Sequence, residues 1–174
     1  MSKLRVIVTC IDLISESVGK CFSWCIVVLI IGICYEVLMR YSFNDPTSWA
    51  YDMSFILYGA LFMMAGAFTL SKGGHVRGDF LYRKWKASNQ AKVDLVLYFL
   101  FFFPGILAMV IAGFGYGYSS FSLGEVSVNS PVGIPIWPLK SLIFFSGFFL
   151  FLQGTGEVLR CVICISEGSW PERK

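Results

Sequence analysis

Charged residues are scarce in this chain: Asp, Glu, Lys and Arg together make up 14% of its 174 residues. A soluble domain carries about 25% charged residues, so the chain has too little polar surface for a water-soluble fold. The formal net charge of +3 is also too small to indicate a nucleic-acid partner. With 56% apolar residues, the composition indicates an integral membrane protein that contacts the lipid bilayer.

Histidine occurs only once, as His75, and the chain offers few other groups for chemistry. One histidine cannot supply both axial ligands of a haem, which argues against a cytochrome-b-like subunit. Cys161 and Cys164 form an isolated CxxC pair, which we interpret either as small apolar filler or as a metal or redox motif. The sequence shows no nucleophile–base pair and no convincing metal cluster. We therefore expect no enzymatic activity and no cofactor in this chain.

Four apolar runs are long enough to cross the membrane as helices. About 20 residues are needed to cross roughly 30 Å of hydrocarbon. The strands of a membrane β-barrel would be shorter and would alternate in polarity, which these runs do not. The expected fold is therefore an all-α integral membrane protein, a single four-helix transmembrane domain over residues 1–174. Its spans are placed at about 19–40, 48–71, 92–122 and 136–162.

The N-terminal segment precedes the first apolar run, which begins near Cys21. A cleaved signal peptide has an apolar core of only about 7–15 residues, whereas this run is long enough to span the membrane. Residues 4–18 carry apolar side chains at helical spacing, with Asp12 and Glu16 among the polar residues between them. The pattern predicts an amphipathic helix, which either lies on the membrane or extends the first span inward.

Proline, glycine and aspartate mark the expected ends of the helices. Asp45 is a candidate N-cap, with Pro46 in the first turn of the second span. The glycines of "KGG" at 72–74 suit a helix C-terminus, where the backbone turns left-handed. Pro104 predicts a kink or an offset start in the third span, and the prolines of 129–138 predict a loop that ends near Trp137.

Lys and Arg are distributed very unevenly among the segments between the spans. Twelve of the fourteen lie in the N-terminal segment, the segment between the second and third spans, and the C-terminal tail. The other two loops carry one each, Arg40 and Lys140. Short segments rich in Lys and Arg stay in the cytoplasm. We therefore expect both termini to be cytoplasmic and the loops around residues 44–49 and 129–138 to face outward.

Several ionisable side chains lie near the ends of the spans, where they are costly unless they pair or face protein. Glu36 and Arg40 are four residues apart, in the order that favours an ion pair on a helix. Asp52, at the same outer side, is placed to join them. Glu157 and Arg160 have i, i+3 spacing at the inner end of the fourth span. We interpret these groups either as interfacial pairs whose side chains reach water or as contacts to a partner membrane protein.

The spans lack the features of a self-contained transport pathway. No ladder of acids crosses the bilayer centre, and no pair of helix breaks indicates inverted repeats. Small residues at 59–67 allow close helix packing, either within a bundle or against a partner. Four helices of this kind are too simple to carry a solute alone.

Two motifs follow the first and second spans. The first is "EVLMRYSFNDPTSWAYD" (36–52), and the second is "GGHVRGDFLYRKW" (73–85). Their order resembles the small membrane subunit of tripartite ATP-independent periplasmic (TRAP) transporters. Asp52 stands where that family often has Glu, and Gly78 where an aliphatic residue is usual. The matching positions are Arg40, Tyr41, Phe43, Asn44, Trp49, Asp52, His75, Arg77 and Asp79; with Glu36 they form the set of candidate motif or partner-interface residues.

The resemblance implies a secondary transporter of the bacterial or archaeal inner membrane without an ATP site. A periplasmic solute-binding protein would deliver an organic anion to a large multi-span subunit holding the solute and sodium sites. The small subunit would be a static scaffold for the large one. Two other interpretations stay open from the residues alone: a membrane anchor of a redox complex, and a self-sufficient small four-helix membrane protein.

Overall fold

Helices form the framework of the fold in the residues that the computed structural model describes, which are 2–74, 82, 84–129 and 131–171. Four helical rods are long and apolar enough to cross a membrane: Lys3–Ser42, Ala50–Ser71, Ala87–Ser122 and Trp137–Glu167. The all-α fold with four membrane-spanning helices is therefore confirmed. The elements are α1 (Ser2–Ser42), α2 (Ala50–Ser71), α4 (Ala87–Leu97), the π-helical turn η1 (Tyr98–Phe102), α5 (Phe103–Ser122) and α6 (Trp137–Glu167).

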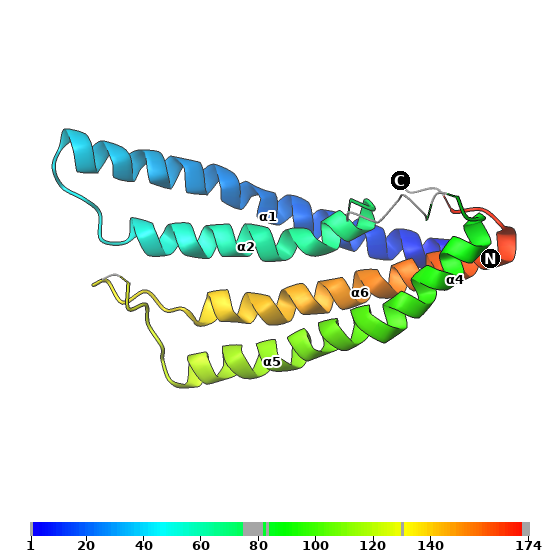
Figure 1. Cartoon of the computed structure of the whole chain (residues 1–174). Helices are drawn as coiled ribbons and strands as arrows, with labels where there is room; N and C mark the ends of the chain where they lie inside the picture. Colours follow the sequence, from blue (N-terminus) through cyan, green and yellow to red (C-terminus); the bar gives the residue numbers. More distant parts are fainter. Residues whose placement is uncertain (1, 75–81, 83, 130, 172–174) are drawn as a thin grey trace.

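The rods lie side by side in the order α1, α2, α6, α5 (Figure 1). Helix α6 is the centre of the packing, because it contacts α1, α2, α4 and α5. In its most apolar stretch 44% of the residues are buried, compared with 6% in α1. The surfaces of α1 and α5 are consequently left to lipid or to other proteins.

The start of α1, the end of α2, the start of α4 and the end of α6 gather at one end of the molecule, the terminal end (Figure 1). The connections at residues 43–49 and 123–136 lie at the opposite end, the loop end. This arrangement agrees with two termini on one side of a membrane. Which side each end faces stays a prediction from the charge distribution.

Helix α1 is one continuous helix of 41 residues. At 1.5 Å per residue it is about 60 Å long, roughly twice the thickness of the hydrocarbon core. The predicted amphipathic segment and the first span are therefore one rod, and the segment extends the span instead of lying on the membrane separately.

The prediction that Asp45 caps the second span is wrong, because α2 begins at Ala50 and no side chain caps it. Residues 43–47 are instead used to finish α1. The carbonyl of Met39 accepts the amide of Asp45 at 3.1 Å, and Asn44 turns left-handed with a φ of 53°. An N-cap carboxylate must face the first amides of its own helix, and this turn places Asp45 at the end of the preceding one.

The predicted C-terminus of the second span is confirmed. Helix α2 ends at Ser71, and Gly73 has the left-handed φ of 67°. The amide of Gly73 donates to the carbonyl of Leu70 at 3.0 Å, and the amide of Gly74 to that of Thr69 at 2.9 Å. These are the two hydrogen bonds of a Schellman motif, which satisfies the last carbonyls of the helix.

The third span is interrupted where Pro104 predicts a break. Proline has no amide hydrogen, so one backbone bond of a regular helix cannot form. The turn η1 precedes it, and the amide of Phe103 donates to the carbonyl of Tyr98, five residues back. The interruption therefore takes the form of a π-helical turn between α4 and α5, where wide hydrogen bonds replace the regular ones.

The connection from α5 to α6 is a short hairpin loop over residues 123–136. The amide of Ser127 donates to the carbonyl of Ile134 at 2.8 Å, and that of Ile136 to Glu125 at 3.2 Å. The loop predicted from its prolines is confirmed, but α6 begins at Trp137 and includes Pro138. A proline in the first turn loses no helical hydrogen bond, so it does not delay the helix.

Small residues allow the helices to approach closely. A Cβ added to Gly113 of α5 would lie 2.8 Å from the backbone nitrogen of Phe144 in α6. In α2, Gly59 faces Leu139 of α6, and Ala60 and Ala67 are 6% and 2% exposed. The small residues of the second span therefore serve packing within this chain.

Candidate functional site

At the loop end, Glu36 joins the end of α1 to the connection that follows it. Its Oε1 accepts a hydrogen bond from Nε of Arg40 at 2.9 Å. Its Oε2 accepts one from the backbone amide of Thr47, also at 2.9 Å, and another from the Thr47 hydroxyl. The predicted Glu36–Arg40 pair is therefore present, and the same carboxylate shapes the 43–49 connection.

The other motif residues of this connection divide into exposed and packed side chains. Tyr41 and Phe43 are 80% and 65% exposed. The ring of Trp49 stacks on Tyr35 with centroids 6.1 Å apart, and both line an apolar groove of about 400 Å³ between α1 and α2. Asn44 supplies the left-handed residue of the turn. Trp49 and Asn44 thus shape the connection, whereas Tyr41 and Phe43 project from it.

Asp52 lies with the hairpin loop and so belongs to a second group of contacts. It is 4% exposed, and its Oδ1 accepts the hydroxyl of Ser127 at 2.7 Å. Close by, Glu125 pairs with Lys140, whose Nζ lies 4.1 Å from the centroid of the Tyr116 ring. The Lys140 ammonium holds the pKa of Glu125 below its ordinary value. These contacts attach the hairpin loop to α2, α5 and α6.

The remaining three motif residues, His75, Arg77 and Asp79, lie outside the described residues. Their role stays a prediction from the sequence.

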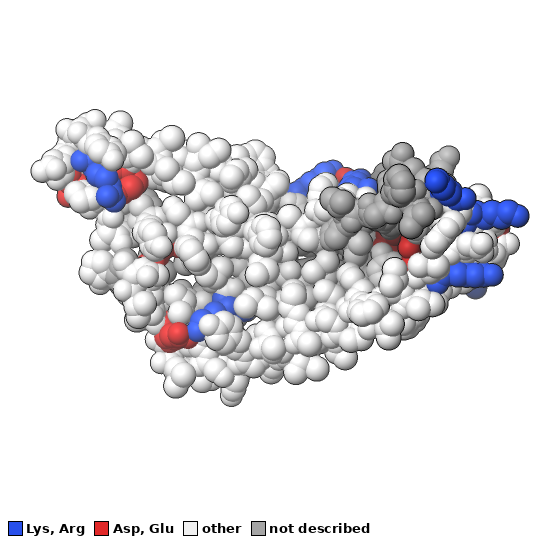
Figure 2. Space-filling model, in the orientation of Figure 1, with Lys and Arg blue, Asp and Glu red and all other residues white. Residues whose placement is uncertain are grey.

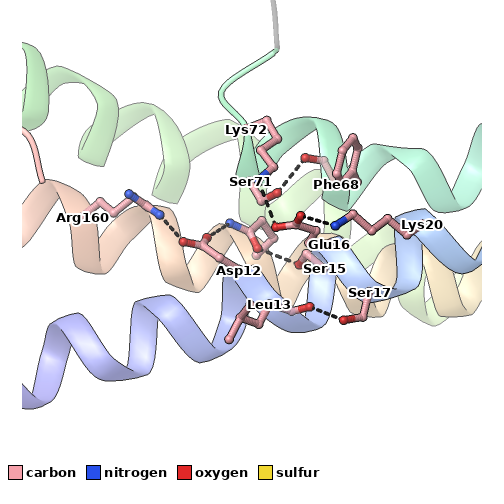
Figure 3. Close-up of polar contacts among 11 residues, drawn as sticks. Asp12, Leu13, Ser15, Glu16, Ser17, Lys20, Phe68, Ser71, Lys72 and Arg160 are labelled. Carbon is pink, nitrogen blue, oxygen red and sulfur yellow. Dashed lines mark hydrogen bonds and ion pairs between the residues drawn. The ribbon is translucent and has the colours of Figure 1, made fainter. Parts of the chain in front are cut away.

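A buried polar cluster lies near the terminal end, and the sequence indicated only its Glu157–Arg160 pair. We call it the Asp12 cluster. It joins α1 to α6 (Figure 3) and consists of Asp12, Ser15, Gln153, Glu157 and Arg160. Oδ1 of Asp12 accepts Nε2 of Gln153 at 2.9 Å, and Oδ2 accepts Nη2 of Arg160. The hydroxyl of Ser15 donates to Oε1 of Gln153 at 2.7 Å. Glu157 lies 3.4 Å from Nε of Arg160.

Burial of the Asp12 cluster corrects one interpretation made from the sequence. The Glu157–Arg160 pair exists, but its side chains are only 2% and 3% exposed. They do not reach water at the membrane surface, because Asp12 from α1 covers Arg160. Two paired charges so well buried are costly to desolvate, and the hydrogen bond from Arg160 to Asp12 offsets part of this cost.

A second set of ion pairs surrounds this cluster. Glu16 accepts the Lys20 ammonium at 2.7 Å and that of Lys72, at the end of α2, at 3.0 Å (Figure 3). Arg5 pairs with Glu167 at 2.5 Å. The polar side of the N-terminal half of α1 therefore faces α2 and α6. In the sequence, the polar residues Asp12, Ser15 and Glu16 have i, i+3 and i+4 spacing, which places them on one face of α1. This spacing was the signal that could have indicated the interface.

A family model described as "Tripartite ATP-independent periplasmic transporters, DctQ component" matches residues 29–163. The chain belongs to the DctQ family. Members of this family are components of transporters, so the chain has a role in transport. Its four long apolar helices make it a multi-pass membrane protein. No curated protein matches the sequence significantly.

The matched DctQ region contains all ten candidate residues of the two motifs, together with Gln153, Glu157 and Arg160. It begins at Leu29, so Asp12 and Ser15 lie N-terminal to it. The part of α1 that completes the buried cluster is therefore outside the region by which the family is recognised.

The two cysteines of the CxxC pair pack as apolar side chains in this DctQ chain. Cys161 and Cys164 are 1% and 0% exposed and contact Ala91 of α4. The thiol of Cys164 faces the carbonyl of Ala87 at 3.5 Å. Their positions between α4 and α6 agree with the apolar-filler interpretation.

Proposed function

We propose that this chain is the scaffold subunit of a transporter that imports an organic acid anion, driven by an ion gradient with sodium as the coupling ion. A periplasmic solute-binding protein delivers the anion, and a large multi-span subunit in the same inner membrane holds the solute and sodium sites. The family match over residues 29–163 is the observation that carries this proposal.

The internal contacts support a scaffold role. Asp12 and Arg160 contact each other, and Glu36 is held by Arg40 and Thr47. Polar groups used in this way stabilise helix packing. The apolar faces of α1 and α5, which the rest of the chain leaves largely uncovered, supply lateral surface for a partner within the membrane.

Tyr41 and Phe43 are the candidate contacts for a partner at the loop end. Their side chains are 80% and 65% exposed beside a connection that Glu36 holds in place. Exposed aromatic side chains on a fixed backbone are typical of protein interfaces. From the sequence, we assign His75, Arg77 and Asp79 to a contact with a partner, or to the shape of the segment between the second and third spans that makes this contact.

Affinity purification in mild detergent tests the proposal. A large multi-span protein is expected to co-purify with this chain in a constant ratio, and uptake in proteoliposomes is expected only when both are present with the binding protein and a sodium gradient. Uptake by this chain alone would refute the scaffold role, and repeated purification without a partner would refute the assembly.

The interface residues are tested separately. Arg40→Ala is expected to lower the yield of the complex, because it removes the partner of Glu36 and loosens the 43–49 connection. Arg5→Ala, which also breaks an exposed ion pair, is the matched control at the terminal end. Equal yields for the two variants would remove Arg40 from the interface.

Orientation is tested with fusions. A reporter after Lys86 is expected in the cytoplasm, and one after Asn44 in the periplasm, because Lys and Arg are concentrated in the two terminal segments and in the segment between the second and third spans. The reverse result would overturn the assigned topology.

A further inference from the structure

The terminal end carries lysines that no carboxylate of the described residues neutralises. Blue side chains gather there in Figure 2. Among the described carboxylates of this end, Glu16 and Glu167 pair with lysine and arginine, and Asp94 accepts the hydroxyl of Tyr82 at 2.6 Å. Lys86 and Lys92 are exposed and have no carboxylate at ion-pair distance among the described residues.

The two lysines lie on a part of the chain that is held firmly. Lys86 precedes the first residue of α4, and Lys92 is in its second turn. On the other side of this helix, Ala91 is fully buried against Cys161 and Cys164. The side-chain amide Nε2 of Gln90 donates to the carbonyl of Trp85 at 3.1 Å. The buried side therefore keeps the lysines at the outer surface of the bundle.

Trp85 stands beside these lysines and is 44% exposed. Its ring lies 6.4 Å from that of Tyr82, and its amide donates to the Tyr82 carbonyl at 3.1 Å. Tryptophan prefers the headgroup level of a bilayer, where its ring is apolar and its NH is wet. The exposed apolar side chains of Val96 and Phe99 follow further along the same span, so we place Trp85 on the headgroup side of the point where the span enters the hydrocarbon.

Unneutralised ammonium groups at headgroup level attract anionic lipid. The expected enrichment is about fivefold for each lysine at low ionic strength, and it decreases with salt because exposed charges are screened. We propose that Lys86 and Lys92, with Trp85 beside them, form a contact site for the phosphate headgroup of an anionic phospholipid. This site is independent of the proposed transport function.

Quenching of Trp85 fluorescence by brominated lipid tests the site. The full chain and its Trp85→Phe variant are reconstituted in phosphatidylcholine vesicles that contain a few per cent of brominated phosphatidylglycerol or brominated phosphatidylcholine. The difference between the two proteins reports Trp85 alone. Quenching is expected to be several-fold stronger with the anionic lipid and to become equal for the two lipids in high salt.

The variant K86Q/K92Q is expected to abolish the preference while the α-helical circular dichroism stays unchanged. Lys20→Gln is the matched control, because Lys20 is paired with Glu16. It removes one charge of the same end and is expected to keep the preference. Equal quenching by the two lipids in the unaltered protein, or a preference that survives K86Q/K92Q, would overturn the proposal.

Two further outcomes distinguish other occupants. Relief of the quenching by millimolar glycerol phosphate would assign the site to a soluble phosphate and overturn the lipid assignment. Absence of quenching by either lipid would show that Trp85 does not reach the bilayer and would also overturn it. None of these measurements depends on transport activity. A negative result for the lipid site would therefore not bear on the proposed function.

Discussion

Arg160 offers the sharpest test of how this membrane protein is held together. Its guanidinium contacts Asp12 of α1 and lies 3.4 Å from Glu157 of its own helix, and the side chain is 3% exposed. Replacing it with methionine keeps much of the volume and removes the charge. Two carboxylates are then left at a site that water reaches poorly.

Removing one partner of a buried ion pair costs about 3–5 kcal/mol. An exposed pair contributes only about 0–1 kcal/mol. Arg160→Met is therefore expected to lower the free energy of unfolding by several kcal/mol. Arg5→Met is expected to change it by less than about 1 kcal/mol, because Arg5 and Glu167 are 55% and 28% exposed.

Unfolding in mixed micelles of dodecyl maltoside and dodecyl sulfate, followed by circular dichroism, measures both variants. A third protein, D12N/E157Q/R160M, replaces all three charges and is expected to recover most of the lost stability, since no charge then remains uncompensated. Equal losses for Arg160→Met and Arg5→Met would refute the reasoning. So would a triple variant no more stable than Arg160→Met.

Two further predictions concern α5 and the hairpin loop. Gly113→Ala is expected to lower the free energy of unfolding by about 1–3 kcal/mol in the same assay, because the added Cβ would press on the backbone of Phe144. Gly115→Ala is the control, because Gly115 faces open space. Equal effects of the two substitutions would contradict the close approach of α5 and α6. Lys140 lowers the pKa of Glu125 from its ordinary 4.5, so the loop contact is fully present above pH 4.5 and is lost as pH falls through the lowered pKa. Lys140→Met removes the contact itself, so the protection of residues 123–136 against hydrogen exchange is expected to be lower than in the unaltered protein above pH 4.5 and no longer to fall with the protonation of Glu125. Protection with an unchanged pH dependence in the variant would contradict the assignment.

Structural features that depend only on residues close together in the sequence could be predicted from it. The number and type of spans follow from the lengths of the apolar runs, and the end of α2 from the glycines at 73 and 74. The Glu36–Arg40 pair follows from helical spacing, because residues four apart lie on one face. Asp45 shows the limit of this reasoning. The sequence assigned this capping residue to the start of α2, whereas its backbone amide donates to the carbonyl of Met39 in the turn that ends α1.

The candidate site was predictable only in part for the same reason. Asp52 was expected beside Glu36, yet it accepts the hydroxyl of Ser127, 75 residues further along the chain. Asp12 and Arg160 are 148 residues apart. Spacing along a helix carries no information about such contacts. The amphipathic pattern of residues 4–18 showed that α1 has a polar side, but not that this side faces protein.

The sequence by itself determined that this protein lies in a lipid bilayer. It has too few charged residues for a water-soluble fold and four apolar runs long enough to cross the membrane. Its motifs at 36–52 and 73–85 also indicated the family, to which the match over residues 29–163 assigns the chain. The tertiary structure alone decided which helix lies at the centre and which polar groups are buried. Apolar residues are equally stable against lipid and against protein, so hydrophobicity cannot select the neighbours of a membrane helix. Close contacts of small residues and matched polar groups, as between α1 and α6, make that choice.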